Sequence, residues 1–191
     1  MIKEIRLSGS GGQGIILIGD ILAEASGIYE EKGVAQNTAY GGQVRGGASK
    51  AEVLIADAGE EIEYPEVIEA DILLAMNQEA LDGFAQEVKD RGVIIVDTSH
   101  VKQIPMTKGR VLPFPITDIA QQKFNNPLVA NMVALGAVVG ATQVVSVEAV
   151  ERAIETKAPE GTAELNKKAF RVGLETVREA GVNPKEEAGN L

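Results

Sequence analysis

The sequence predicts an α/β protein, a three-layer α/β/α sandwich with a mostly parallel (mixed) central sheet of Rossmann-like type. First, apolar runs of strand length, such as residues 71–76 and 93–97, alternate with stretches of helical apolar spacing. Second, aromatic residues are scarce, with four Phe, three Tyr and no Trp, so an aliphatic core is expected, which suits a buried parallel sheet. Third, a glycine-rich turn lies between the first predicted strand and the first predicted helix.

The first half of the chain carries strands with one long helix between them. In order, the patterns predict a strand at 2–7, a helix at 15–30, and strands at 34–37, 49–56 and 71–76. A short edge strand at 62–64, stopped by Pro65, and a helical turn at 66–69 are expected before the last of these.

The second half begins with Asn77, which can cap a helix carrying Leu81, Phe84, Ala85 and Val88 at helical spacing. The next predicted elements, in order, are a strand at 93–97, an edge strand at 110–114, a short helix at 118–123 and a long helix from Asn126-Pro127 to about Gln143. Ser146 caps the following helix, and Gly161-Thr162 begins the last one.

Length and charge limit the classes of protein to consider. The 191 residues are enough for one well-filled domain, expected at 1–182, followed by a polar tail at 183–191. The net charge of −10 argues against nucleic acid as a partner, because such binding needs clustered positive charge. The most apolar run, at 128–145, is interrupted by polar residues and glycines, which predicts a buried helix and no membrane segment.

The complete absence of cysteine removes disulfides, thiolate catalysis and cysteine-ligated metal clusters from this chain. No signal peptide is recognisable before the first strand. A cytoplasmic location is therefore expected.

The first glycine cluster, Gly9-Ser10-Gly11-Gly12-Gln13-Gly14, is the principal candidate site. Glycines serve where the backbone takes a positive φ or where another group comes close, and a helix start presents N–H groups to anions. The cluster also fits the G-x-G-x-x-G fingerprint of dinucleotide-binding proteins. That fingerprint needs an acidic residue about 20 positions on, whereas the second strand ends in Gln36-Asn37-Thr38. Anion binding, dinucleotide binding and simple close packing remain the three alternatives.

A second glycine cluster, Tyr40-Gly41-Gly42-Gln43-Val44-Arg45-Gly46-Gly47, follows about one βα unit later. One interpretation is a solvated arginine on a flexible turn. We favour a ligand or interface role for Arg45, because its neighbouring glycines are costly to order and guanidinium groups suit carboxylates and phosphates.

No catalytic constellation is predicted. The one histidine, His100, follows Asp97-Thr98-Ser99, and three triad members within four residues do not give triad geometry. We interpret His100 as a loop residue at a strand end. The carboxylates are scattered, so neither a metal site nor an acid/base pair is expected.

Taken together, the motifs resemble the gamma subunit of 2-oxoacid:ferredoxin oxidoreductases over residues 3 to about 180. They are, in order, Gly9-x-Gly11-Gly12-Gln13-Gly14, Tyr40-Gly41 with Arg45-Gly46-Gly47, residues 70–76, and Asn131-Met132-Val133-Ala134-Leu135-Gly136. Within that family the sequence looks most like the 2-oxoglutarate enzymes. The pyruvate, 2-oxoisovalerate and indolepyruvate enzymes remain alternatives.

The resemblance implies a subunit of a complex that decarboxylates a 2-oxoacid, forms the acyl-CoA and passes electrons to ferredoxin. It implies alpha, beta and ferredoxin-like delta partners that carry thiamine diphosphate, Mg and Fe–S clusters, with coenzyme A as co-substrate and no cofactor on this chain. It maps a CoA, substrate-side or interface role onto Gly9, Gly11, Gly12, Gln13, Gly14, Arg45, Gly46 and Gly47. Tyr40 and Asn131 match the motifs without an assigned role.

The isolated chain should be inactive and is expected to form a homodimer through its exposed interface area. Two alternatives remain, a stand-alone nucleotide- or flavin-binding oxidoreductase and a purely structural subunit whose glycines serve packing.

Overall fold

A computed structural model describes residues 1–40 and 49–183. Its strands are β1 (Ile2–Gly9), β2 (Gly33–Ala39), β3 (Ser49–Ala56), β4 (Ala70–Ala75), β5 (Val88–Asp97) and β6 (Arg110–Phe114). Its α-helices are α1 (Ile15–Glu24), α2 (Gln78–Phe84), α3 (Ile116–Phe124), α4 (Ala130–Thr142), α5 (Val147–Lys157) and α6 (Ala163–Glu179). A π-helical turn, η1 (Ala25–Tyr29), and the 3-10 turns η4 (Ala85–Glu87) and η5 (Pro127–Val129) complete them.

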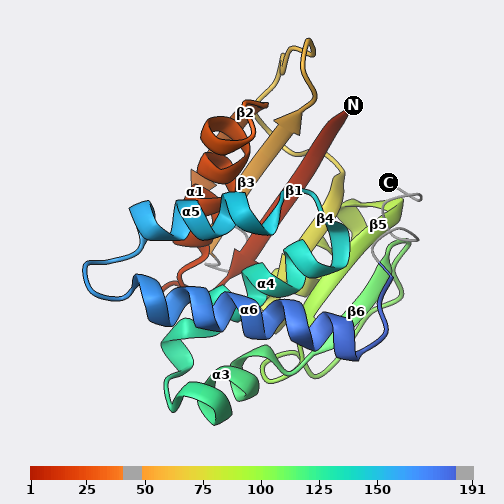
Figure 1. Ribbon diagram of the computed structural model, residues 1–191. Coiled ribbons are helices and arrows are strands. Elements are labelled where there is room, and N and C mark those ends of the chain that lie inside the picture. The colour runs from red at the N-terminus through yellow and green to blue at the C-terminus, as the bar shows by residue number, and fades with distance from the viewer. Residues whose placement is uncertain (41–48, 184–191) are drawn as a thin grey trace.

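The strands form one six-stranded sheet in the order β2-β3-β1-β4-β5-β6 (Figure 1). β1, β4, β5 and β6 are parallel, whereas β3 is antiparallel to both β1 and β2. The expected α/β fold with a mixed, mostly parallel sheet is therefore confirmed. The sheet differs from that of dinucleotide-binding proteins, because the antiparallel strand β3 lies between β1 and β2.

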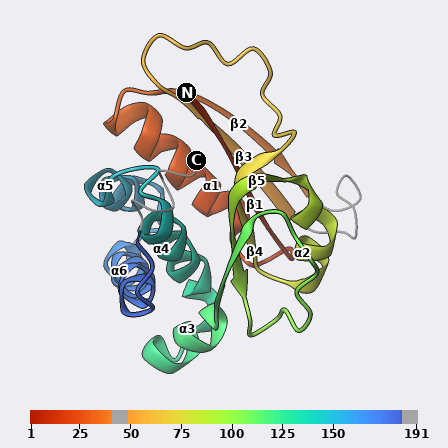
Figure 2. The same ribbon diagram turned by 90° about the vertical axis from the view of Figure 1, so that its right-hand side faces the viewer.

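The two faces of the sheet are covered unequally. Figure 2 shows α1, α4, α5 and α6 together on one side of the sheet and α2 alone on the other. α4 is the central helix, and every one of its 13 residues except Gly140 is buried. α4 and α6 cross in contact at Gly136 and Gly173, where a Cβ on either glycine would lie 2.0 Å from a carbonyl oxygen of the other helix.

A buried arginine links the sheet to the elements that cover its second face. Arg6 on β1 is 3% exposed, and its Nε donates to Oε1 of the fully buried Glu52 on β3 at 2.8 Å. Its Nη2 donates to the Val67 carbonyl oxygen, and its Nη1 donates to Glu87, the last residue of the turn η4 that follows α2. The guanidinium carbon also lies 4.7 Å from the centre of the Phe84 ring. These contacts hold α2 and the connection before β4 against the sheet.

Three local predictions are wrong. Residues 62–64 form no strand and residues 66–69 form no helical turn, because the whole connection from β3 to β4 is irregular. Val88 belongs to β5, where it pairs with Ala70, and α2 ends at Phe84. An apolar valine fits a helical or a strand pattern equally well, and here pairing with the sheet prevails. The other predicted elements are present within a few residues. No helix in residues 1–40 and 49–183 is long and apolar enough to cross a membrane.

Candidate anion-binding site at the glycine turn

The first glycine cluster forms the turn between β1 and α1, at the carboxyl edge of the parallel strands. The turn is joined to the end of β4, because the Met76 N–H donates to the Ser8 carbonyl oxygen at 2.9 Å. β4 is parallel to β1, and β5 and β6 end at the same edge. Open α/β sheets bind ligands at this edge, where neighbouring connections diverge to opposite faces.

The four glycines of the turn have different structural roles. A Cβ on Gly9 would lie 2.5 Å from Gln13 Oε1, and a Cβ on Gly14 would lie 2.3 Å from Asn131 Nδ2. Gly12 needs its positive φ of 86°. At Gly11 nothing lies within 4 Å of the Cβ position, and its φ is not positive. Close packing therefore explains Gly9 and Gly14 but does not explain Gly11, whose exposed backbone is open to an approaching group.

Side-chain amides fix the shape of the turn. Gln13 Oε1 accepts from the Ser10 N–H at 2.6 Å, and Gln13 Nε2 donates to the Met76 carbonyl oxygen at 3.3 Å. Asn77 Nδ2 donates to Ser10 Oγ at 2.6 Å, while Asn77 Oδ1 accepts from the Ala80 N–H and caps α2 as expected. Because both ends of the Gln13 amide bond within the chain, this residue holds the turn in place.

The N-terminus of α1 lies at the turn, and the start of α4 packs against it. α1 follows Gly14, and α4 begins one residue before Asn131, whose amide packs against Gly14. α4 continues directly from η5, whose start is capped by Asn126 Oδ1 accepting from the Leu128 N–H at 3.0 Å. Neither α1 nor α4 has an acidic residue in its first turn, and α1 has no side-chain cap. The other described α-helices all have an acid there, namely Glu79 in α2, Asp118 in α3, Glu148 in α5 and Glu164 in α6. The positive end of α1 is thus left for an external anion.

A hollow opens beside these helix ends. It measures about 190 Å³ and is lined by Gly12, Gln13, Met76, His100, Thr117, Pro127, Leu128 and Ala130. A wider, more open hollow lies next to it, lined by Ser10, Gln13, Asn77, Gln78, Glu79 and His100. The exposed side chain of Leu128 provides an apolar rim. We call the glycine turn, the starts of α1 and α4, and these two hollows the glycine-turn site.

His100 lies in a loop after β5, as expected, but it also lines both hollows of the glycine-turn site. Its position after a buried strand at the carboxyl edge is the signal that could have identified it. The side-chain carboxylate of Asp97 accepts hydrogen bonds from the Thr117 hydroxyl at 2.6 Å and from the Ser99 N–H at 3.0 Å. Among these residues no Ser–His–Asp triad is formed.

Arg45, Gly46 and Gly47 lie outside the described residues, as do Gly41 and Gly42. The residues that flank them do lie at the glycine-turn edge. Ser49 pairs directly with Gly9, and Ala39 pairs with Lys50 in the next register position. Ser49, which follows the second glycine segment, is therefore adjacent to the first glycine turn, whereas Ala39, which precedes that segment, lies one strand further away.

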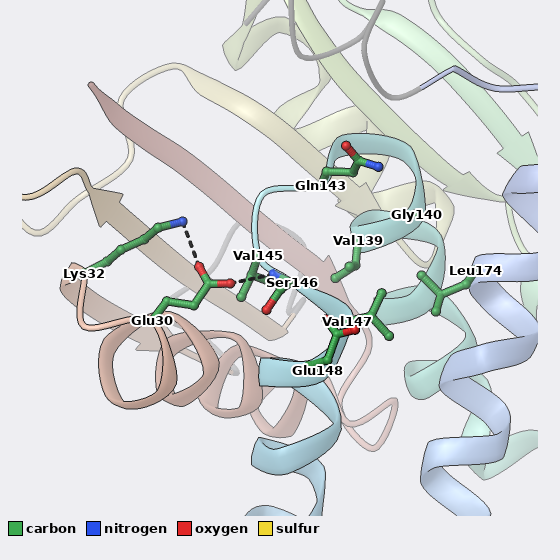
Figure 3. Close-up of a pocket in the computed structure, with 10 residues that line it drawn as sticks. All are labelled: Glu30, Lys32, Val139, Gly140, Gln143, Val145, Ser146, Val147, Glu148 and Leu174. Carbon is green, nitrogen blue, oxygen red and sulfur yellow. Dashed lines mark hydrogen bonds and ion pairs between the residues drawn. The ribbon is translucent and has the colours of Figure 1, made fainter.

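A third hollow, about 460 Å³, lies at the opposite edge of the sheet, near the end of η1 and the start of α5 (Figure 3). There Glu30 accepts the Ser146 N–H at 2.6 Å and pairs with Lys32 at 2.8 Å. Burial raises the pKa of Glu30, but Lys32 and Ser146 together outweigh it, so this pKa lies below its ordinary value. The N-terminus of α5 is already satisfied, so size alone does not make this hollow the candidate site.

The described residues offer no ligand set for a metal ion or an iron–sulfur cluster. The chain has no cysteine, and the described residues contain no group of three His, Cys, Asp or Glu that could hold a metal ion. The end of β2 lies two strands from β1, about 10 Å away at the usual strand spacing, so it does not offer the ribose contact of a dinucleotide fold.

The fold and the site define an α/β protein with a ligand-accommodating turn at a strand–helix junction. The chain matches the pyruvate ferredoxin/flavodoxin oxidoreductase family over residues 4–176, and it belongs to that family. It is 45% identical to the 2-oxoglutarate synthase subunit KorC of Methanocaldococcus jannaschii over 181 residues, 94% of this chain and 96% of that protein.

Two solved structures share the fold. The gamma subunit of a keto/oxoacid ferredoxin oxidoreductase from Geobacter sulfurreducens is 44% identical, with a TM-score of 0.82 over 93% of this chain and 99% of that one. A pyruvate oxidoreductase subunit from Thermotoga maritima is 29% identical, with a TM-score of 0.74 over 91% and 96% of the two chains. The resemblance to gamma subunits of 2-oxoacid:ferredoxin oxidoreductases is confirmed, and with it the expected class, a subunit of a multi-subunit oxidoreductase.

Proposed function

We propose that this chain serves a 2-oxoglutarate:ferredoxin oxidoreductase and that its glycine-turn site holds an anionic group of coenzyme A or of the 2-oxoacid. The choice of 2-oxoglutarate is supported by the 45% identity to a 2-oxoglutarate synthase subunit, against 29% to a pyruvate oxidoreductase subunit. The single observation that carries the site is the uncapped, acid-free N-terminus of α1, which lies beside the open backbone of Gly11 and faces a hollow.

The residues of the site would have two roles in binding, stabilising the anion and fixing the shape of the turn. The backbone N–H groups at the start of α1 would stabilise the negative charge, and Gln13 and Asn77 would hold the turn in the shape that binds it. Thiamine diphosphate with Mg, and Fe–S clusters, on alpha, beta and delta subunits would supply the decarboxylation and the transfer of electrons to ferredoxin. Arg45, Gly46 and Gly47 would approach the same anionic group or the partner surface from the second glycine segment.

Partner subunits would cover the rim of the glycine-turn site. Tyr40 and Leu128 are 66% and 76% exposed, and both lie at this edge of the chain. Large exposed apolar side chains favour association, so the isolated chain should form a homodimer when its partners are absent. The cytoplasmic location also remains a prediction.

Co-purification tests the assembly. A tagged copy of the chain, isolated from its own cells, should bring down a thiamine-diphosphate protein and an iron–sulfur protein in constant proportion. A chain that purifies alone under gentle conditions would argue against this function. Titration with NAD(H), NADP(H), FAD and FMN tests the stand-alone alternative, which micromolar binding to the isolated chain would support.

The Gly11→Asp and Gly11→Asn variants test the site. Both side chains enter open space, so both variants should fold normally, and they differ only in charge. At a separation of about 6 Å and an effective dielectric constant of about 20, two like charges repel by roughly 3 kcal/mol, so Gly11→Asp should raise the KM for the anion by about 100-fold. Gly11→Asn should have little effect. Equal KM values for both variants and the unmodified complex would refute the anion site.

A further inference from the structure

β2 is an open edge of the sheet, because it is the outermost strand and pairs only with β3 (Figure 1). All seven of its residues pair with β3 in one continuous register. Within the described part of the chain, no backbone group of β2 has a hydrogen-bond partner outside the sheet. An edge strand turns every second N–H and C=O away from its neighbour, so β2 presents a row of backbone groups that a further strand can bind.

β2 lacks the features that usually protect an edge strand from pairing with another chain. It contains no charged residue, no proline and no bulge, whereas each of the other five described strands carries at least one charged residue. The strand at the opposite edge, β6, is shorter, with five residues, and it includes Arg110 and Pro113. Of the two edges of the sheet, only the one at β2 is therefore suited to strand pairing.

The side chains of β2 are also incompletely covered. None of its residues is buried, whereas every other described strand has buried residues. Two exposed apolar side chains flank the strand, Tyr40 directly after it and Ile28 in η1, with exposed fractions of 66% and 68%. Ile28 follows Gly27, where a Cβ would lie 3.4 Å from Val34 Cγ2, so η1 lies beside β2. A strand added to β2 would cover part of this surface as well as pair with its backbone.

We propose that β2 pairs with β2 of a second copy of this chain, antiparallel and about a two-fold axis. The chain has a net charge of −10, so two copies repel each other over most of their surfaces, but two copies of β2 bring no charges together. Full overlap of the two strands centres on Gln36. It places Val34 opposite Thr38 of the second copy, so that two β-branched side chains meet on each side of the axis.

This pairing gives the homodimer proposed above a defined surface, and it does not depend on the anion site. Antiparallel pairing turns the carboxyl edges of the two sheets in opposite directions, so Ala39 of one copy lies opposite Gly33 of the other. The glycine turn follows β1, which is separated from β2 by β3. A dimer formed in this way therefore leaves both glycine-turn sites accessible.

Cysteine substitution provides a direct test, because the chain contains no cysteine of its own. Opposed residues of an antiparallel pair have Cα atoms about 4.5–5.5 Å apart, within the range of about 4.4–6.8 Å that a disulfide allows, and only the residue at the axis lies opposite itself. Of Ala35→Cys, Gln36→Cys and Asn37→Cys, one alone should give a disulfide-linked dimer of the full chain under mild oxidation. Full overlap predicts that it is Gln36→Cys. Arg110→Cys, at the exposed start of β6, is the control and should not cross-link.

The dissociation constant of the dimer, measured by sedimentation equilibrium, provides a second test. Thr38 is exposed, so Thr38→Lys and Thr38→Val should both keep the urea midpoint of the unmodified chain. Lysine adds the kind of charge that protects natural edge strands, whereas valine keeps the shape of threonine. Because each change enters both copies, Thr38→Lys should raise the dissociation constant by about tenfold, and Thr38→Val should change it by less than about threefold.

Three results would overturn the proposal. If the unmodified chain is monomeric, the homodimer is refuted together with its surface. If the chain dimerises but no β2 cysteine cross-links more than Arg110→Cys, or Thr38→Lys leaves the dissociation constant unchanged, the homodimer stands and the β2 surface is refuted. If the β2 cysteines cross-link only to a different subunit in the assembled complex, β2 binds a strand of that subunit and not a second copy. None of these results bears on the glycine-turn site, which the Gly11 variants test separately.

Discussion

Replacing Gly14 with alanine should destabilise the chain through two separable effects. Gly14 has a φ of 70°, and a left-handed conformation costs a non-glycine residue about 1–2 kcal/mol. The new Cβ would also lie 2.3 Å from Asn131 Nδ2, and such overpacking costs about 1–3 kcal/mol. The free energy of unfolding of Gly14→Ala should therefore fall by about 2–5 kcal/mol in total.

A double-mutant cycle divides this loss into its parts. Unfolding of the full chain in urea, followed by circular dichroism, gives the free energy for the unmodified chain, both single variants and the double variant. On the Asn131→Ala background the clash is gone, so Gly14→Ala should cost only the conformational part, about 1–2 kcal/mol. An equal cost on both backgrounds would show that Gly14 and Asn131 are not in contact. No cost on either would show that Gly14 does not adopt the left-handed conformation.

Three further predictions concern the rest of the chain. Gly173→Ala should lower the urea midpoint by an amount equivalent to about 3 kcal/mol or more, because the new Cβ would lie 2.0 Å from a carbonyl oxygen of α4. An unchanged midpoint would contradict the close crossing of α4 and α6. Arg6→Met should cost about 3 kcal/mol, because the fully buried Glu52 loses its guanidinium and keeps only the Lys50 ammonium, 3.0 Å away, as a partner. Glu87→Gln, at the exposed end of the network, should cost less than about 1 kcal/mol, and equal losses for the two variants would refute this ranking. The pKa of Glu30 is lowered on folding, so its ionised form stabilises the chain above its unfolded pKa, and this contribution is lost as the pH falls through the folded pKa. Glu30→Gln should thus be less stable than the unmodified chain near pH 7, and the difference should shrink as the pH falls below about 4. A constant difference would contradict the ion pair.

The strand and helix patterns predicted most elements because their periodicity reports burial directly. Pairing direction has no such signal, so the antiparallel insertion of β3 between β1 and β2 became apparent only in the structure. The Arg6–Glu52 pair could not be predicted either, since a single arginine in a short strand does not indicate that it is buried.

The sequence located the glycine turn, but it could not assign a role to each glycine. Gly9 and Gly14 pack against side chains, Gly12 has a positive φ, and Gly11 remains open. Asn131 lies far from the turn along the chain, and only the fold places its amide against Gly14. Such long-range contacts cannot be read from local spacing.

Hydrogen–deuterium exchange on the assembled complex tests the central claim most directly. The first-turn amides of α1 have no intrahelical partner, so they should exchange quickly in the free complex. Adding coenzyme A or 2-oxoglutarate should slow exchange in peptides that cover residues 10–17 and 128–134. Peptides covering residues 143–150, at the already capped start of α5, serve as the internal control and should not change. Protection of the control peptides alone, or of neither region by either compound, would contradict an anion site at the glycine turn.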